Sequence, residues 1–231
     1  MDKPLSWQTL EFPIPSSLAS LSMAKTAMSP SPNRLLYFLM RDSPNSALLT
    51  SLSLTSLQFS PPVRVNLPRG VFIHRMLSVH NSLLLLKNCL KGDPSPFLVI
   101  TDPETPSVSP INLSCSDDFF SFGATNNESS VFLFGGVNFS LGPKADLWKL
   151  SLTSLRFKKI IGLGTGPSPR LEPIMNVSGE SLLIAGGFAS APLYSSRVLT
   201  DAYVFHLKAS TWQRVDSGWG ARDMTPICAD K

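Results

Sequence analysis

Histidine and cysteine are the side chains with which this chain would bind a transition metal or form a thiol centre. It has three of each, far apart and with neither a CxxC pair nor an HExxH segment: His74, His80, His206, Cys89, Cys115 and Cys228. Compact ligand spacing marks structural and catalytic zinc sites. We therefore predict no metal site, no cofactor and no disulfide framework, and we expect reduced, mostly buried thiols.

A glycine-rich segment at 162–166, with the sequence Gly-Leu-Gly-Thr-Gly, has the composition of a phosphate-binding loop. It lacks the following lysine and the strand-to-helix context that gives such loops their anion-binding amides. The sequence also contains no Gly-x-Ser-x-Gly nucleophile segment. We interpret 162–166 as an ordinary connection between elements, and we predict that the chain is not an enzyme.

Charge and hydropathy limit the classes of partner that the chain could bind. The net charge is +4, only 16% of residues are charged, and lysine and arginine are scattered rather than gathered in a stripe. The longest apolar runs, at 35–40 and 83–86, are too short to span a bilayer, and the first residues do not form a secretory signal. We expect a cytoplasmic protein that binds neither nucleic acid nor membrane.

The elements that would position functional side chains repeat along the sequence. An apolar strand ends in a glycine pair twice, at Gly135-Gly136 and at Gly186-Gly187, about 50 residues apart. Each pair is followed by two aromatic residues nine positions apart, which are Trp148 and Phe157 in one copy and Tyr203 and Trp212 in the other. A period near fifty residues in a strand-rich sequence predicts the blades of a β-propeller.

The repeat extends upstream. Apolar strands begin at 35, 83, 131 and 182, and the segment 54–59 resembles 152–157, two periods later. These spacings predict one propeller segment over 1–231, with repeats at about 20–59, 70–113, 116–160 and 170–215. Each repeat is predicted to contain four short strands, and the second is apolar throughout because neighbouring blades cover both of its faces.

This pattern resembles the kelch-repeat family. The family's blades have an apolar strand that ends in a glycine pair, then an aromatic residue, then a tryptophan, and its P-x-x-R segment matches 167–170 here. The resemblance is close over 116–215 and weaker over 20–113, where Leu39-Met40 and Lys87-Asn88 replace the glycines. It implies an all-β, kelch-type β-propeller of about four four-stranded blades, in which the glycines and large aromatics serve packing.

The two ends of the chain bear on closure of the ring. Trp7 to Leu10 resembles Trp212 to Val215, the predicted outer strand of the last repeat. This pattern fits a small closed ring, an incomplete propeller or a truncated product. An incomplete ring exposes strand edges and an apolar blade face, so we also expect self-association.

The loops after each second strand, at 41–46, 88–96, 137–145 and 188–200, differ in length and composition while the strands stay similar. Rigid strands that carry variable loops are typical of binding platforms. The side chains of the types enriched at interface anchors are Phe139, Tyr194 and Arg197. We predict a non-catalytic scaffold or adaptor that binds another protein. The alternative is a small-molecule or sugar-binding protein, or an enzyme, that uses the central funnel of the propeller.

Overall fold

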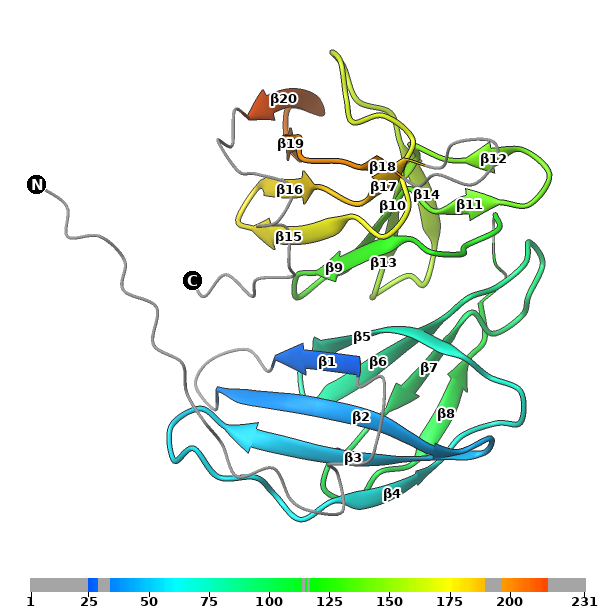
Figure 1. The fold of residues 1–231 in the computed structure, drawn as a ribbon, viewed down its shortest axis with the longest axis vertical. Helices are drawn as coiled ribbons and strands as arrows, with labels where there is room; N and C mark the ends of the chain where they lie inside the picture. The colour runs from blue at the N-terminus through cyan, green and yellow to red at the C-terminus, as the bar shows by residue number, and fades with distance from the viewer. Residues whose placement is uncertain (1–24, 29–33, 114, 116, 190–196, 216–231) are drawn as a thin grey trace, which may run out of the picture.

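A computed structural model of the chain describes residues 25–28, 34–113, 115, 117–189 and 197–215, and these fold into strands, turns and loops (Figure 1). Within these ranges there is no helix, and so none that could span a membrane. The expected segment Trp7 to Leu10 lies outside the described residues. The fold is all-β.

The strands form four antiparallel sheets of four strands each, which we number as blades 1 to 4. Blade 1 contains β1 (Lys25–Met28), β2 (Leu35–Ser43), β3 (Ser46–Ser53) and β4 (Val63–Asn66). Blade 2 contains β5 (Ile73–Val79), β6 (Ser82–Lys87), β7 (Phe97–Ile100) and β8 (Val108–Ile111). In both blades the strands lie in chain order.

Blades 3 and 4 have the same order, with a short hairpin inserted between the second and third strands. Blade 3 contains β9 (Gly123–Asn126), β10 (Ser130–Phe134), β13 (Leu147–Ser151) and β14 (Phe157–Ile160). Blade 4 contains β15 (Ile174–Ser178), β16 (Ser181–Ala185), β19 (Ala202–His206) and β20 (Thr211–Val215). The inserted hairpins are β11 (Val137–Asn138) with β12 (Gly142–Pro143), and β17 (Phe188–Ala189) with β18 (Arg197–Val198).

The outer edge of blade 1 starts where the sequence pattern indicated, but its regular strand β4 lies later. The similar segments 54–59 and 152–157 share a turn, in which the N–H of Leu57 donates to Ser53 and that of Leu155 donates to Ser151. Blade 3 enters its outer strand at Phe157 directly. In blade 1 Phe59 likewise pairs with Leu52 of β3, but two prolines at 61 and 62 follow. Since proline has no N–H for a ladder, the pairing is interrupted there, and β4 begins at Val63.

Apolar side chains fill the three spaces between consecutive blades. One core joins blades 1 and 2, a second joins blades 2 and 3, and a third joins blades 3 and 4. The inner strands β1, β5, β9 and β15 face the middle of the molecule, while β4 and β20 lie at its two extremes (Figure 1). Among the described residues no fourth core joins blade 4 to blade 1.

The repeated glycines and aromatics occupy packed positions. Gly136 has a φ of +85°, and a Cβ there would overlap the carbonyl oxygen of Phe120; Gly187, at +89°, would place a Cβ 2.5 Å from that of Leu171. Each second glycine therefore allows a blade-to-blade connection to pass closely. The repeated aromatics lie in or beside the cores: Trp148 and Phe157 against Phe119, Trp212 against Phe205, and Tyr203 beneath Arg170.

Candidate functional site

The loops expected to bind a partner lie at one end of the blades, which we call the loop end. They are 41–46, 88–96 and the segments that carry the β11–β12 and β17–β18 hairpins, all toward the right of the view in Figure 1. In a sheet of four antiparallel strands, the connection from one blade to the next emerges at this same end. The loop end therefore combines loops from all four blades.

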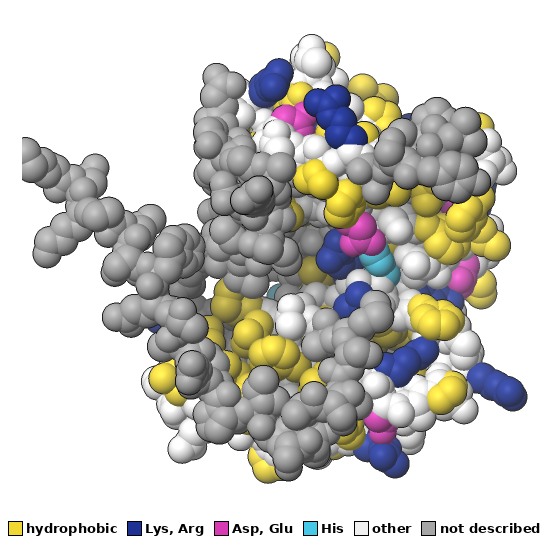
Figure 2. Space-filling model, in the orientation of Figure 1, with side chains coloured by type: hydrophobic (Ala, Val, Ile, Leu, Met, Phe, Trp, Pro, Cys, Tyr) yellow, Lys and Arg dark blue, Asp and Glu magenta, His cyan; other side chains and the backbone are white. Residues whose placement is uncertain are grey.

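Large apolar side chains are exposed on the loop end. Phe139 is 68% exposed and Leu141, at the tip of the same hairpin, is 85% exposed. We call five of these side chains the apolar rim: Phe72, Leu90, Phe139, Leu141 and Phe188. Figure 2 shows hydrophobic side chains gathered along the right-hand side of the molecule. Exposed apolar clusters on a soluble domain mark interaction sites.

The β11–β12 hairpin that carries Phe139 and Leu141 is held firmly. Asn138 caps the turn with its Oδ1, which accepts the N–H groups of Ser140 and Leu141 at 2.9 Å. Its Nδ2 donates to Asp118 Oδ2 at 2.7 Å, which ties the hairpin to the connection between blades 2 and 3. A side chain on such a support loses little conformational freedom when a partner binds.

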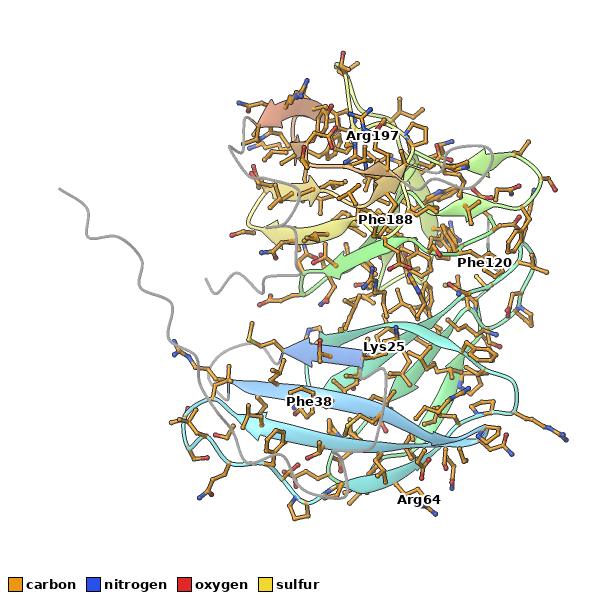
Figure 3. The ribbon with its side chains drawn as sticks, viewed as in Figure 1. Lys25, Phe38, Arg64, Phe120, Phe188 and Arg197 are labelled. Carbon is orange, nitrogen blue, oxygen red and sulfur yellow. The ribbon has the colours of Figure 1, made fainter. Side chains whose placement is uncertain are left out.

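Two further contacts fix this hairpin. The Lys144 Nζ lies 3.0 Å from Asp117 Oδ2, and the lysine is almost fully buried. The ring of Phe139 packs against Phe120, with ring centroids 4.5 Å apart; Figure 3 labels Phe120 below the hairpin. The exposed face of Phe139 is thus presented in one orientation.

The structure describes two of the three residues that were predicted to anchor a partner. Phe139 lies at the tip of the β11–β12 hairpin. Arg197 lies exposed on β18, and Figure 3 labels it above Phe188 of the same hairpin. Tyr194 falls outside the described residues. Sequence reasoning missed Phe72, Leu90 and Leu141, because a single apolar residue in a loop has no period that distinguishes it.

A buried arginine connects the two hairpins to the sheets. Arg170 is completely buried, and its guanidinium binds both carboxylate oxygens of Asp201 at 2.8 and 3.1 Å. Its backbone N–H donates to Lys144 and its carbonyl accepts the N–H of Gly136. Burial alone would raise the pKa of Asp201, but the hydrogen bonds and charge of Arg170 outweigh it and lower that pKa. Arg170 ends the P-x-x-R segment identified in the sequence.

Ionisable side chains also meet where the inner strand of blade 2 faces the connection that leads into β15, a place that we call the central opening. Arg75 binds Glu172 at 2.7 Å, and His74 Nε2 lies 2.8 Å from the carbonyl oxygen of Phe122 and 3.7 Å from Glu172 Oε1. Lys25, labelled in Figure 3, lies on the inner strand of blade 1 and faces this opening. Burial lowers the pKa of His74, which favours its neutral form.

A cavity lies at the opposite end of the blades, which we call the turn end. It measures about 560 Å³ and lies between blades 2 and 3. Its lining is mixed, with apolar walls and a few polar groups: Val79, His80, Ser82, Leu84, Val99, Ile111, Glu128, Ser129, Leu152, Thr153 and Leu155. Cavities of 300–1,000 Å³ with such linings accommodate small molecules.

Comparison with known proteins extends this description. No family model matches the chain. Tip elongation aberrant protein 1 of Schizosaccharomyces pombe is 32% identical over 92 residues, which is 40% of this chain and 8% of that protein. Kelch domain-containing protein 3 of Homo sapiens is 33% identical over 73 residues, which is 31% of this chain and 19% of that protein.

The solved structure of YjhT superposes with a TM-score of 0.61 at 12% identity, covering 84% of this chain and 70% of that one. The superposition shows a shared fold, and the repeats and the named relatives agree with it. The chain is similar in sequence to kelch-repeat proteins and shares the fold of YjhT. The chain matches only small parts of these two longer relatives, 8% and 19% of their lengths.

Proposed function

We propose that this kelch-repeat chain is a non-catalytic scaffold that binds another protein through the apolar rim. The observation that carries the proposal is the pair Phe139 and Leu141, which is strongly exposed on a hairpin fixed by Asn138 and Lys144. Large apolar side chains on a rigid support are the usual anchors of interfaces, since they bury area without a large cost in conformational entropy.

The test compares variants at the two ends of the blades. Phe139→Ser and Leu141→Ser remove the two most exposed side chains of one hairpin, and Leu57→Ser removes an apolar side chain, 44% exposed, at the turn end. A partner is first captured by the wild-type chain, identified by mass spectrometry and purified. We expect each hairpin variant to bind that partner at least about tenfold more weakly, which corresponds to about 1.4 kcal/mol, and Leu57→Ser to bind as the wild type does.

Arg197→Ala tests the second hairpin in the same assay. If Phe139→Ser and Leu141→Ser bind the partner as tightly as the wild type does, the apolar rim is not part of the interface. Circular dichroism spectra and unfolding midpoints of all variants must match that of the wild type, so that a loss of binding reports contact rather than folding.

A second function, small-molecule or sugar binding with or without catalysis, is favoured by two observations. The central opening gathers Lys25, His74, Arg75 and Glu172, and the turn end has a cavity of suitable size. A thermal-shift screen with metal analysis tests it. If a ligand stabilises the wild type but not Arg75→Met, it binds in the central opening. If it stabilises the wild type but not Val99→Trp, it binds in the cavity at the turn end. A screen that returns neither a metal nor a stabilising ligand contradicts this function.

A further inference from the structure

Two cysteines that are distant in the sequence meet beneath the loop end. Their Sγ atoms are 2.6 Å apart, and both side chains are buried, with exposed fractions of 3% for Cys89 and 2% for Cys115. Both are free thiols. The sequence predicted separate thiols, because no CxxC spacing joins them; their approach depends on how two loops pack, which no local pattern records.

The backbone on both sides holds the two cysteines in place. Cys89 forms a two-way bridge with Phe119, in which each N–H donates to the other's carbonyl at 3.0 and 2.9 Å. The N–H of Cys115 donates to Asp93, and its carbonyl accepts the N–H of Gly92, both at 2.8 Å. These hydrogen bonds therefore hold the loop 88–96 and the connection between blades 2 and 3 together, with the two sulfur atoms adjacent in the reduced chain.

We propose that Cys89 and Cys115 form a reversible disulfide when the chain meets a hydroperoxide, and that this bond locks the loop 88–96 to the connection between blades 2 and 3. A disulfide has an S–S length of about 2.05 Å, so bond formation requires the sulfur atoms to move by only about 0.5 Å. The site is independent of the proposed partner.

The reaction proceeds in two steps. The Cys115 thiolate attacks one oxygen of hydrogen peroxide; the O–O bond breaks, hydroxide leaves and takes up the proton that the thiol released, and Cys115 becomes a sulfenic acid. The Cys89 sulfur then attacks the Cys115 sulfur; the S–O bond breaks, and the hydroxyl group leaves with the Cys89 proton as water. Two thiols lose two electrons, and one peroxide is reduced to two waters.

The pair is asymmetric in a way that supports these roles. The hydrogen bond from Cys89 lowers the pKa of Cys115, while the same interaction and burial raise the pKa of Cys89. Because the thiolate is the nucleophile, Cys115 reacts first and Cys89 resolves the sulfenic acid. Hydrogen peroxide is small enough to reach a buried thiol during local opening of the loops.

The bond would act directly below the candidate interface. The neighbouring carboxylates of Asp117 and Asp118 hold Lys144 and Asn138 of the β11–β12 hairpin, and Asp118 also accepts the N–H of Lys91 in the loop 88–96. A disulfide at Cys115 therefore fixes the segment to which both loops are attached.

The experiment uses the full chain with Cys228→Ser, so that only the pair can react. The reduced protein is treated with hydrogen peroxide, alkylated and digested. Mass spectrometry should find the peptides of Cys89 and Cys115 joined, with the loss of two hydrogen atoms, and the thermal midpoint should rise by roughly 5–10 °C because a loop is closed. Dithiothreitol should reverse both changes.

Single variants separate the two roles. In Cys89→Ser, peroxide should leave a Cys115 sulfenic acid that dimedone traps; in Cys115→Ser, Cys89 should remain alkylatable under the same conditions. The proposal is overturned if both thiols of the Cys228→Ser chain stay free after native peroxide treatment, or if the disulfide joins two chains. Equal trapping of both single variants would overturn the assignment of Cys115 as the attacking residue.

Discussion

The guanidinium of Arg170 shows how a buried charge can organise a fold. It is completely buried, yet it reaches both oxygens of Asp201 and the carbonyls of Ser168 and Gly186. Arg64, by contrast, is 69% exposed and pairs with Asp42 at 3.0 Å on the surface. Removal of one partner from a buried pair leaves an uncompensated charge, whereas water solvates what is left of an exposed pair.

We therefore predict that Arg170→Met lowers the free energy of unfolding by about 3–5 kcal/mol. The matched control, Arg64→Met, should lower it by less than about 1 kcal/mol. Urea unfolding followed by circular dichroism measures both midpoints. If Arg170→Met proves as mild as Arg64→Met, the arginine does not hold the two hairpins to the sheets.

His74 gives the stability of the fold a pH dependence. Its pKa is lowered from the ordinary histidine value of 6.5, chiefly by burial and also by the charges of Arg75 and Lys25, while Glu172 acts in the opposite direction. The unfolded chain therefore binds a proton at this histidine at a pH where the folded chain does not. The free energy of unfolding must fall as the pH falls through and below about 6.5.

Substitution His74→Gln should flatten this part of the pH profile. Urea midpoints measured between pH 8 and pH 5 should fall less steeply for His74→Gln than for the wild type. Parallel profiles for His74→Gln and the wild type would show that His74 does not carry the dependence.

Sequence reasoning worked best where an element is specified locally. The second strands begin at 35, 82, 130 and 181, within one residue of the starts predicted from apolar runs. An apolar run bounded by turn residues determines such a strand by itself. The β11–β12 and β17–β18 hairpins and the Cys89–Cys115 pair were missed, since each depends on contacts between segments that the local sequence does not encode. The late start of β4 was also missed, although the prolines at 61 and 62 that cause it are a local signal.

The second glycine of each pair is also specified locally. It provides a left-handed backbone conformation and leaves space for a close contact, and a comparison with Gly142 separates these two contributions. Gly136 and Gly142 have φ values of +85° and +87°, but a Cβ at Gly136 would strike the carbonyl of Phe120, whereas a Cβ at Gly142 would meet nothing within 4 Å. Gly142→Ala should thus lower the unfolding free energy by about 1–2 kcal/mol, the cost of a left-handed backbone alone.

Gly136→Ala should cost clearly more than Gly142→Ala, because the blade-to-blade connection at Phe120 must also move. Urea midpoints of the two variants provide the comparison. Equal costs would mean that the connection shifts freely, and that the glycine pair serves backbone conformation rather than close packing.

At the scale of the whole molecule, the first and last blades each have a face that no other described blade covers. In β2, Tyr37 and Leu39 pack toward blade 2, so Phe38 between them points away, and its ring lies 5.7 Å from that of Phe59. In blade 4, Leu183 and Val204 pair across strands on the face opposite the core with blade 3. Apolar blade faces without a neighbour favour association with another chain.

We therefore predict that the chain self-associates through these two faces. Sedimentation equilibrium over a range of protein concentrations should show a rising average mass. Val204→Lys places a charge on the open face of blade 4, where burial without a partner is costly, and should weaken association at least about tenfold, or about 1.4 kcal/mol. Leu57→Lys, which introduces the same charge at the turn end, should associate as the wild type does. A compact monomer at the highest concentration would show that neither face binds a second copy, and that the ring is stable as an isolated arc of blades.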